Sequence, residues 1–181
     1  MTEDSWKRWG AYAGVLLPLA AVLVLRWQND LLVVLLLKSA MVLFGYFYAL
    51  CDLRQKRIPN KLVLSMLGAW VLIMIPQLFL HTQQTLLLML DGMIGAVLGG
   101  GLFLLVYFIS RKGLGGGDVK LMAASGLYLG VSRILPAMLY GSVLAALVGL
   151  SLVLFKKIGR RDTIALAPFL FVGMLVTMLV Q

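Results

Sequence analysis

Long apolar runs separated by short polar segments make up most of this 181-residue chain. A helix needs about 20 residues to cross the hydrocarbon core of a membrane, and fewer where neighbouring helices bury it. Seven runs fit this description, although the fifth is short and rich in small residues that favour packing against other helices. They cover approximately residues 10–25, 31–51, 62–80, 86–110, 119–131, 134–155 and 163–180. The pattern predicts an all-α, polytopic transmembrane helix bundle of six to seven helices.

The composition supports lipid as the main solvent of the chain. Hydrophobic residues make up 62% of it and charged residues 13%, a mixture that no soluble domain of this size could bury in one core. No soluble domain fits between the runs, so residues 1–181 are interpreted as a single integral membrane domain. No small-residue cleavage site follows the first run, which therefore reads as a retained anchor and not as a signal peptide.

The positions of the basic residues predict the orientation, because short cytoplasmic loops retain Lys and Arg. One set of alternate loops holds only Arg26 and Arg133, and Lys38 lies within the second run, where it either snorkels to the outer surface or forms a functional ion pair. The other set holds Lys7, Arg8, Arg54, Lys56, Arg57, Lys61, Arg111, Lys112, Lys120, Lys156, Lys157, Arg160 and Arg161. The N-terminus is therefore predicted to be cytoplasmic. The net charge of +9 comes from these membrane-flanking clusters, which favour lipid headgroups and not nucleic acid as the partner.

Two of the seven acidic residues, Asp52 and Asp118, adjoin apolar runs on the predicted cytoplasmic side. An ionisable group is costly there unless it is paired or used. Each has an ordinary structural explanation: Asp52 could pair with Arg54 or Lys56 at a helix end, and Asp118 could cap the helix that follows it. Taken separately, neither residue indicates chemistry.

The segments around the two aspartates are unusual. Residues 52–60 read as a tight loop, because Pro59 does not fit a helix interior and Asn60 is a good N-cap for the third run. Residues 113–117 contain four glycines and predict a mobile loop that admits an extended peptide. This loop lacks the Gly-Lys-Ser/Thr ending of a phosphate-binding loop and the strand that precedes a dinucleotide site.

Two carboxyl groups that lie close together hold one proton between them, so one can activate a water while the other donates a proton to the carbonyl oxygen. This chemistry requires no metal and no cofactor. The single histidine, His81, falls on the opposite side of the membrane, so the sequence offers no convincing metal-ligand set. Serine catalysis lacks a nearby histidine base, but a serine–lysine pair stays open.

At these residues the chain resembles the type IV prepilin peptidases, aspartic proteases of the Gly-x-Gly-Asp class. Asp52 is followed by Ile-Pro-Asn at 58–60, and the segment 115–118 reads Gly-Gly-Gly-Asp. The continuation over 119–124 is also similar to the family, and Ala-Pro-Phe-Leu at 167–170 is a weaker similarity.

The resemblance implies a helical membrane enzyme of the bacterial inner membrane that cleaves the basic leader of type IV prepilins or pseudopilins at the cytoplasmic face. Pilus or secretion machinery is an implied partner, and the oligomeric state is not indicated. The implied site comprises the catalytic pair Asp52 and Asp118 and the loop residues Gly115, Gly117, Pro59 and Asn60.

Larger members of the family carry a cytoplasmic insertion, often with paired cysteines, and also methylate the new N-terminus. Here only residues 26–30 separate the first two runs, and Cys51 is the single cysteine. The chain is therefore similar to the compact peptidases of tight-adherence pilus systems, and we expect no methyltransferase activity. Two other functions remain as alternatives: a non-catalytic subunit of a secretion or pilus machine, and a transporter built around Lys38.

Overall fold

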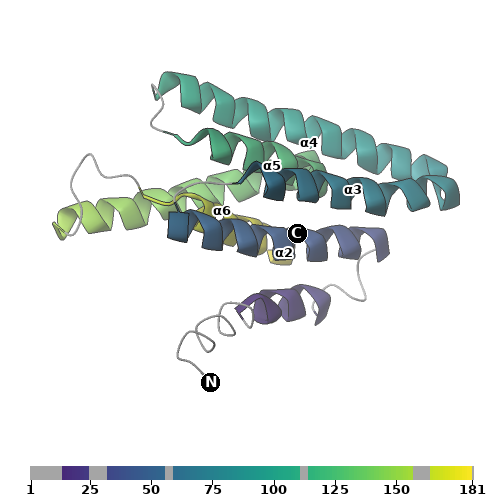
Figure 1. The fold of residues 1–181 in the computed structure, drawn as a ribbon, viewed down its shortest axis with the longest axis horizontal. Coiled ribbons are helices and arrows are strands. Elements are labelled where there is room, and N and C mark those ends of the chain that lie inside the picture. Colours follow the sequence, from purple (N-terminus) through teal and green to yellow (C-terminus); the bar gives the residue numbers. More distant parts are fainter. Residues whose placement is uncertain (1–13, 25–31, 56–58, 111–113, 157–163, 181) are drawn as a thin grey trace.

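The protein is a bundle of helices (Figure 1). The computed structural model describes residues 14–24, 32–55, 59–110, 114–156 and 164–180. The labelled helices are α2 (Leu32–Gln55), α3 (Asn60–Leu80), α4 (Thr82–Ile109), α5 (Gly116–Leu154) and α6 (Ala167–Val180). A further apolar helix, Gly14–Val24, precedes them. No strand occurs in these described ranges, so the predicted all-α class is confirmed.

Helix α5 contains both the fifth and the sixth predicted runs and reverses direction at Gly130. Gly130 has φ 70° and ψ −179°, a conformation open almost only to glycine. A Cβ placed on Gly99 of α4 would meet the Met122 carbonyl oxygen at 2.7 Å and Ile134 at 2.9 Å, so both residues lie beside Gly99. An unbroken helix would separate Met122 and Ile134 by about 18 Å. The two predicted runs are therefore two helical arms joined by a turn (Figure 1).

Glycines bring α4 into close contact with the first arm of α5. Four glycines of the fourth apolar run would each place an added Cβ within 3 Å of an α5 atom, namely Gly92, Gly95, Gly99 and Gly100. The fifth, Gly101, faces open space. Small residues that allow backbones to approach closely are the usual means of packing helices in membranes.

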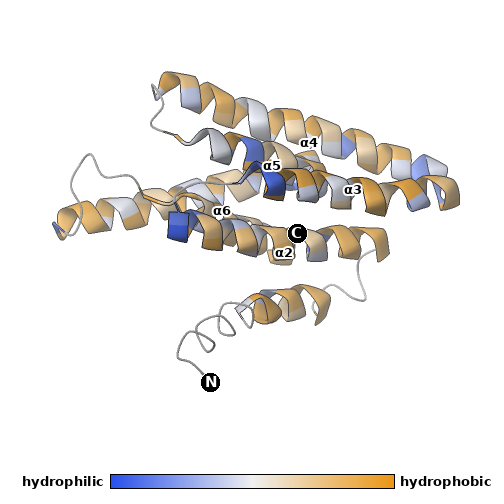
Figure 2. Ribbon diagram, viewed as in Figure 1, coloured by the Kyte–Doolittle hydropathy of each residue, from blue (hydrophilic) through white to orange (hydrophobic). Residues whose placement is uncertain are grey.

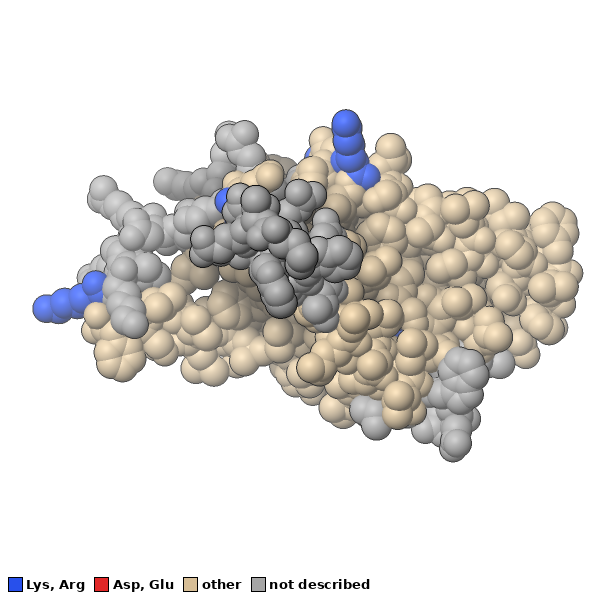
Figure 3. Space-filling view, turned by 60° about the horizontal axis from the view of Figure 1, so that its bottom comes forward, with Lys and Arg blue, Asp and Glu red and all other residues tan. Residues whose placement is uncertain are grey.

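Four helices, α2 to α5, are long and apolar enough to cross a membrane, while α6 and Gly14–Val24 are apolar but shorter. Large hydrophobic side chains cover much of the outer surface, particularly on α4 and α5. Figure 2 shows long hydrophobic stretches on every labelled helix, and the face in Figure 3 is almost entirely uncharged among the atoms it describes. These features belong to a multi-pass membrane protein, although whether every run spans stays a prediction.

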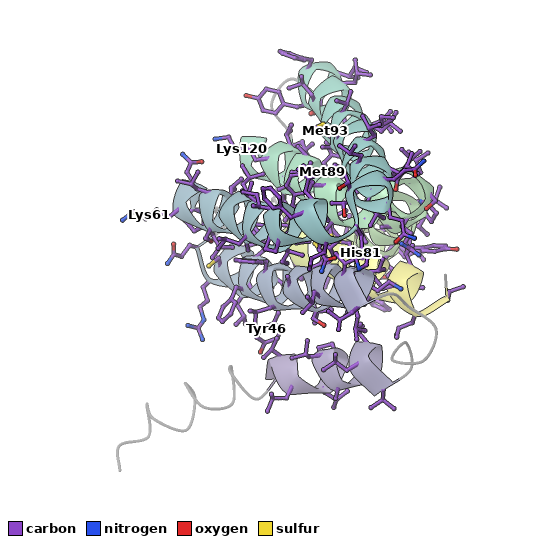
Figure 4. The ribbon with its side chains drawn as sticks, turned by 90° about the vertical axis from the view of Figure 1, so that its right-hand side faces the viewer. Tyr46, Lys61, His81, Met89, Met93 and Lys120 are labelled. Carbon is purple, nitrogen blue, oxygen red and sulfur yellow. The ribbon has the colours of Figure 1, made fainter. Side chains whose placement is uncertain are left out.

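Helix α2 lies at the centre of one side of the bundle, between α3 and α6. Tyr46 projects from α2 toward the first helix (Figure 4), where its hydroxyl lies against Gly14. Lys38, also on α2, is only 2% exposed, so the expectation that it snorkels to the surface is wrong. Helix α2 contacts α3, α5 and α6, and Lys38 is among its buried residues, so the side chain stays within the bundle.

Candidate active site

Asp52 lies in the last turn of α2 and points into the bundle. The helix continues to Gln55, so the prediction of a loop beginning at Asp52 is wrong. The helix extends beyond the end of its apolar run, because its backbone hydrogen bonds form whether the side chains are apolar or polar. Asp52 is 7% exposed, and its Oδ2 accepts a hydrogen bond of 3.0 Å from the backbone N–H of Ala167.

Ala167 is the first residue of α6, so Asp52 faces the positive end of that helix dipole. Pro168 occupies the same turn, and it has a fixed φ but no N–H to donate. The family-like Ala-Pro segment therefore orients one backbone donor at Asp52. The sequence indicated this segment only as a weak similarity, because nothing local marks a backbone N–H as a partner for a residue 115 positions away.

Asp118 is the third residue of α5 and is 9% exposed. The interpretation of Asp118 as an N-cap is wrong, because Gly115 occupies the N-cap position without a side-chain cap. The Asp118 carboxylate instead receives a hydrogen bond from the Gly115 backbone, the arrangement in which a side chain in the first turn reaches back to the cap residue. Its Oδ1 is buried and has no hydrogen-bond partner among the described residues.

The two carboxyl groups interact with each other electrostatically. They come from motifs 66 positions apart in the sequence, on α2 and α5. The structure thus places Asp52 and Asp118 together, as the sequence predicted, with both groups more than nine-tenths buried. Two carboxyl groups in this position cannot both ionise without strong repulsion.

The glycine-rich loop is shorter than predicted. Gly116 and Gly117 already belong to α5, so the interpretation of Gly117 as a loop residue is wrong, while Gly113 lies outside the described residues. The helix begins early because Gly115 takes an extended N-cap conformation and accepts the Asp118 N–H at 3.0 Å. A Cβ on Gly115 would approach the Asp118 Oδ2 to 2.9 Å. Glycine at 115 therefore leaves the carboxylate its space.

Pro59 and Asn60 lie where α3 begins. Pro59 is in the N-cap position, and Asn60 is the first helical residue, so the prediction of Asn60 as the N-cap is wrong. The Asn60 side chain is used elsewhere: its Oδ1 accepts a hydrogen bond of 2.9 Å from Lys120 Nζ. Lys120 follows Asp118 by two residues. This contact joins the start of α3 to the first turns of α5, where Asp118 lies.

Two further contacts fix α3 against the first arm of α5. The indole N–H of Trp70 donates to the Leu127 carbonyl at 3.0 Å, and the Tyr128 hydroxyl donates to the Met66 carbonyl. The sequence did not indicate these pairings. Among the residues that the structure describes, no three His, Cys, Asp or Glu side chains group as a metal site.

A family model described as the type IV leader peptidase family matches residues 39–150, the part of the chain that contains both aspartates. The chain belongs to this family. A prepilin leader peptidase/N-methyltransferase of Escherichia coli is 32% identical over 149 residues, which cover 75% of this chain and 61% of that protein. The protein of the same name from Xanthomonas campestris is 31% identical over 143 residues, or 75% of this chain and 47% of the relative.

A third relative, the Bacillus subtilis protein of that name, is 33% identical over 82 residues, covering 45% of this chain and 33% of the relative. The chain thus spans between a third and about three fifths of the curated relatives described here. No solved structure matches it.

Proposed function

We infer that this member of the type IV leader peptidase family is an aspartic endopeptidase that uses Asp52 and Asp118 as its catalytic pair. Its substrates would be type IV prepilins or pseudopilins, whose basic leader it removes at the cytoplasmic face of the bacterial plasma membrane. The observation that carries this proposal is the burial of two interacting carboxyl groups from separate motifs, one of which has an oxygen with no hydrogen-bond partner among the described residues.

The chemistry follows from a pair that holds one proton. The ionised carboxyl takes a proton from a water molecule, and the resulting hydroxide adds to the peptide carbonyl carbon while the protonated carboxyl donates to the carbonyl oxygen. The tetrahedral intermediate then expels the amine, which leaves with a proton from the pair. The titration belongs to the pair as a unit, and neither residue is assigned the proton.

Three contacts support a fixed geometry for this reaction. Ala167 N–H holds Asp52, the Gly115 backbone holds Asp118, and Lys120 ties its own segment to Asn60. Groups that are already held in place do not have to reorganise as charge develops in the transition state. This preorganisation lowers the activation free energy of the reaction. The apolar outer surface would bind the hydrophobic helix that follows the leader.

The decisive experiment replaces each aspartate by asparagine, which keeps the shape of the side chain and removes the carboxyl. We expect Asp52→Asn and Asp118→Asn each to slow cleavage of a co-expressed prepilin by at least about 10³-fold. Cleavage is read from the size of the pilin, and membrane insertion of each variant is checked by fractionation. Normal processing by either variant would exclude the pair and favour a non-catalytic role in a pilus or secretion machine.

Methyl transfer provides a second test. We propose that the chain is a peptidase without N-methyltransferase activity, because its first two apolar runs are separated only by residues 26–30 and it has a single cysteine. The purified chain, incubated with a cleavable prepilin and radiolabelled S-adenosylmethionine, is expected to release the leader without labelling the mature pilin. Label in the pilin at a level comparable to cleavage would contradict this.

A further inference from the structure

Two fully buried hydroxyl groups below the aspartate pair have no hydrogen-bond partner among the described residues. They are those of Tyr48 on α2 and Ser125 on α5, and both residues are 0% exposed. The Asp118 Oδ1 shares this condition. Leaving a buried donor or acceptor unsatisfied costs about 1–3 kcal/mol, so such groups need an explanation.

Among the described residues, two other buried hydroxyls bond backbone carbonyls, whereas Ser39 Oγ on α2 also lacks a partner. Thr177 donates to the Gly173 carbonyl four residues earlier at 2.9 Å, and Tyr128 donates to the Met66 carbonyl. The exposed Ser151 makes the same helical bond to the carbonyl four residues before it, at 2.7 Å. Ser125 sits in a helix where the same bond is available to it, yet it does not make one. Its hydroxyl therefore has hydrogen-bonding capacity that no described protein atom uses.

Helix geometry places the two hydroxyls below the aspartates. Tyr48 precedes Asp52 by four residues and Ser125 follows Asp118 by seven, so each lies on the same helix face as its aspartate. Because α2 ends and α5 begins at the aspartate pair, both hydroxyls lie deeper in the bundle, one to two turns away.

The two helices also bring these faces together. Helices α2 and α5 contact each other, and Tyr48 belongs to the same buried core cluster as Tyr128, which is three residues after Ser125. A single helix face of α5 therefore carries Asp118, Ser125 and Tyr128 toward the α2 face that carries Tyr48 and Asp52.

We propose that Tyr48 and Ser125 hold internal water in a polar column that leads to Asp118 Oδ1, and that this column supplies the water activated by the aspartate pair. The ligand is water, which satisfies buried polar groups that protein atoms leave unpaired. The proposal rests on the proposed peptidase function for its catalytic part. Peptide hydrolysis needs a water molecule at the two carboxyl groups. These groups are buried, and a bound substrate would separate them still more from bulk water.

Radiolytic footprinting of the wild-type chain in detergent detects such water directly. Hydroxyl radicals generated from water by X-rays modify side chains that touch it, including buried ones. We expect Tyr48 to be modified despite its burial, while Met74 on α3, which is 1% exposed and intrinsically more reactive, stays unmodified. This measurement does not depend on catalysis. It therefore tests whether internal water is present even if the proposed peptidase function is wrong.

Substitutions test the role of the column. Tyr48→Phe removes one hydroxyl, and we expect prepilin cleavage to slow by about tenfold in kcat with little change in KM. We also expect the midpoint of thermal unfolding to fall by about 2–4 °C, because bound water loses a partner. The matched control is Tyr140→Phe, since Tyr140 is 39% exposed on the second arm of α5 and should change neither quantity.

Ser125→Ala tests the other hydroxyl, with the exposed Ser151→Ala as its control. We expect the Ser125 variant to behave like Tyr48→Phe and the Ser151 variant to behave like wild type. In a dry interior, removal of an unsatisfied hydroxyl is neutral or stabilising. The proposal is therefore overturned if Tyr48 is as unmodified as Met74, or if Tyr48→Phe cleaves at the wild-type rate and unfolds at the same or a higher temperature.

Discussion

Two regions of the molecule use an aspartate to accept a hydrogen bond from the first backbone N–H groups of a helix, and they differ in what else the carboxyl does. At one end, Asp52 accepts from Ala167 at the start of α6. At the turn within α5, Asp91 Oδ1 accepts from Val131 at 3.1 Å, where the second helical arm begins. Both contacts are ordinary capping bonds.

The surroundings separate the two regions. The second oxygen of Asp91 lies against the backbone of Gly130, so this carboxyl is packed into the turn with no other acid beside it in the part of the chain described. Asp52 instead interacts with a second buried carboxyl, Asp118, whose Oδ1 has no partner among the described residues. An aspartate thus has a structural role at the turn, where Asp91 is packed. In the buried pair, Asp118 has an oxygen whose hydrogen-bonding capacity is unused among the described residues.

The largest structural effect is expected from Gly130→Ala. A Cβ there would lie 1.8 Å from Asp91 Oδ2, and φ of 70° with an extended ψ is strained for any other residue. We expect the substitution to cost more than about 2 kcal/mol of stability, measured as the free energy of unfolding in detergent. Gly101→Ala on α4, with open space around its Cβ, is the control and should be neutral or stabilising. Equal stabilities of the two variants would contradict the role of the turn.

Asp91 distinguishes a structural carboxyl from a reactive one. We expect Asp91→Ala to lower stability by about 1 kcal/mol, as loss of a cap does, and Asp91→Asn to lower it less because asparagine still accepts the Val131 N–H. Cleavage per folded molecule should stay at the wild-type level in both. The comparison fails if Asp91→Asn loses cleavage to the extent expected for Asp118→Asn.

The smallest effect is expected at the exposed contact between Lys120 and Asn60. In a double-mutant cycle of Lys120→Met and Asn60→Ala, we expect a coupling of about 0.5 kcal/mol in stability. Each single variant should lower kcat about three- to tenfold with KM nearly unchanged, because the first turns of α5, where Asp118 lies, lose their tie to the start of α3. Additive effects on both stability and kcat would show that the contact does not position the pair.

Sequence pattern alone was sufficient for the helical class. In lipid the backbone N–H and C=O groups of a long apolar run must bond each other, and a helix does this within one segment. Both aspartates were also found from sequence, because an acid beside an apolar run is rare and the segments around both are distinctive. Helix ends were less accurate: α2 runs past Cys51 to Gln55, and α5 begins at Gly116.

The contacts that the sequence missed and the cap that it misplaced share a physical cause. Trp70 is 6% exposed, and its indole N–H bonds the Leu127 carbonyl, a pairing that the sequence did not indicate. Local composition shows that an indole is amphipathic but not which backbone its N–H will meet. The same holds for Asn60, whose capping propensity was overridden by Lys120 from another helix.

Sequence by itself therefore determined that this chain is a membrane helix bundle with two unusual acids beside its apolar runs, because hydropathy and motif spacing are local properties. Only the tertiary structure decided that Asp52 faces the N-terminus of α6 and that one Asp118 oxygen has no partner in the part of the chain described. Those facts depend on how distant helices dock. The aspartates are thus helix-end residues in their local sequence and a buried pair in the folded bundle.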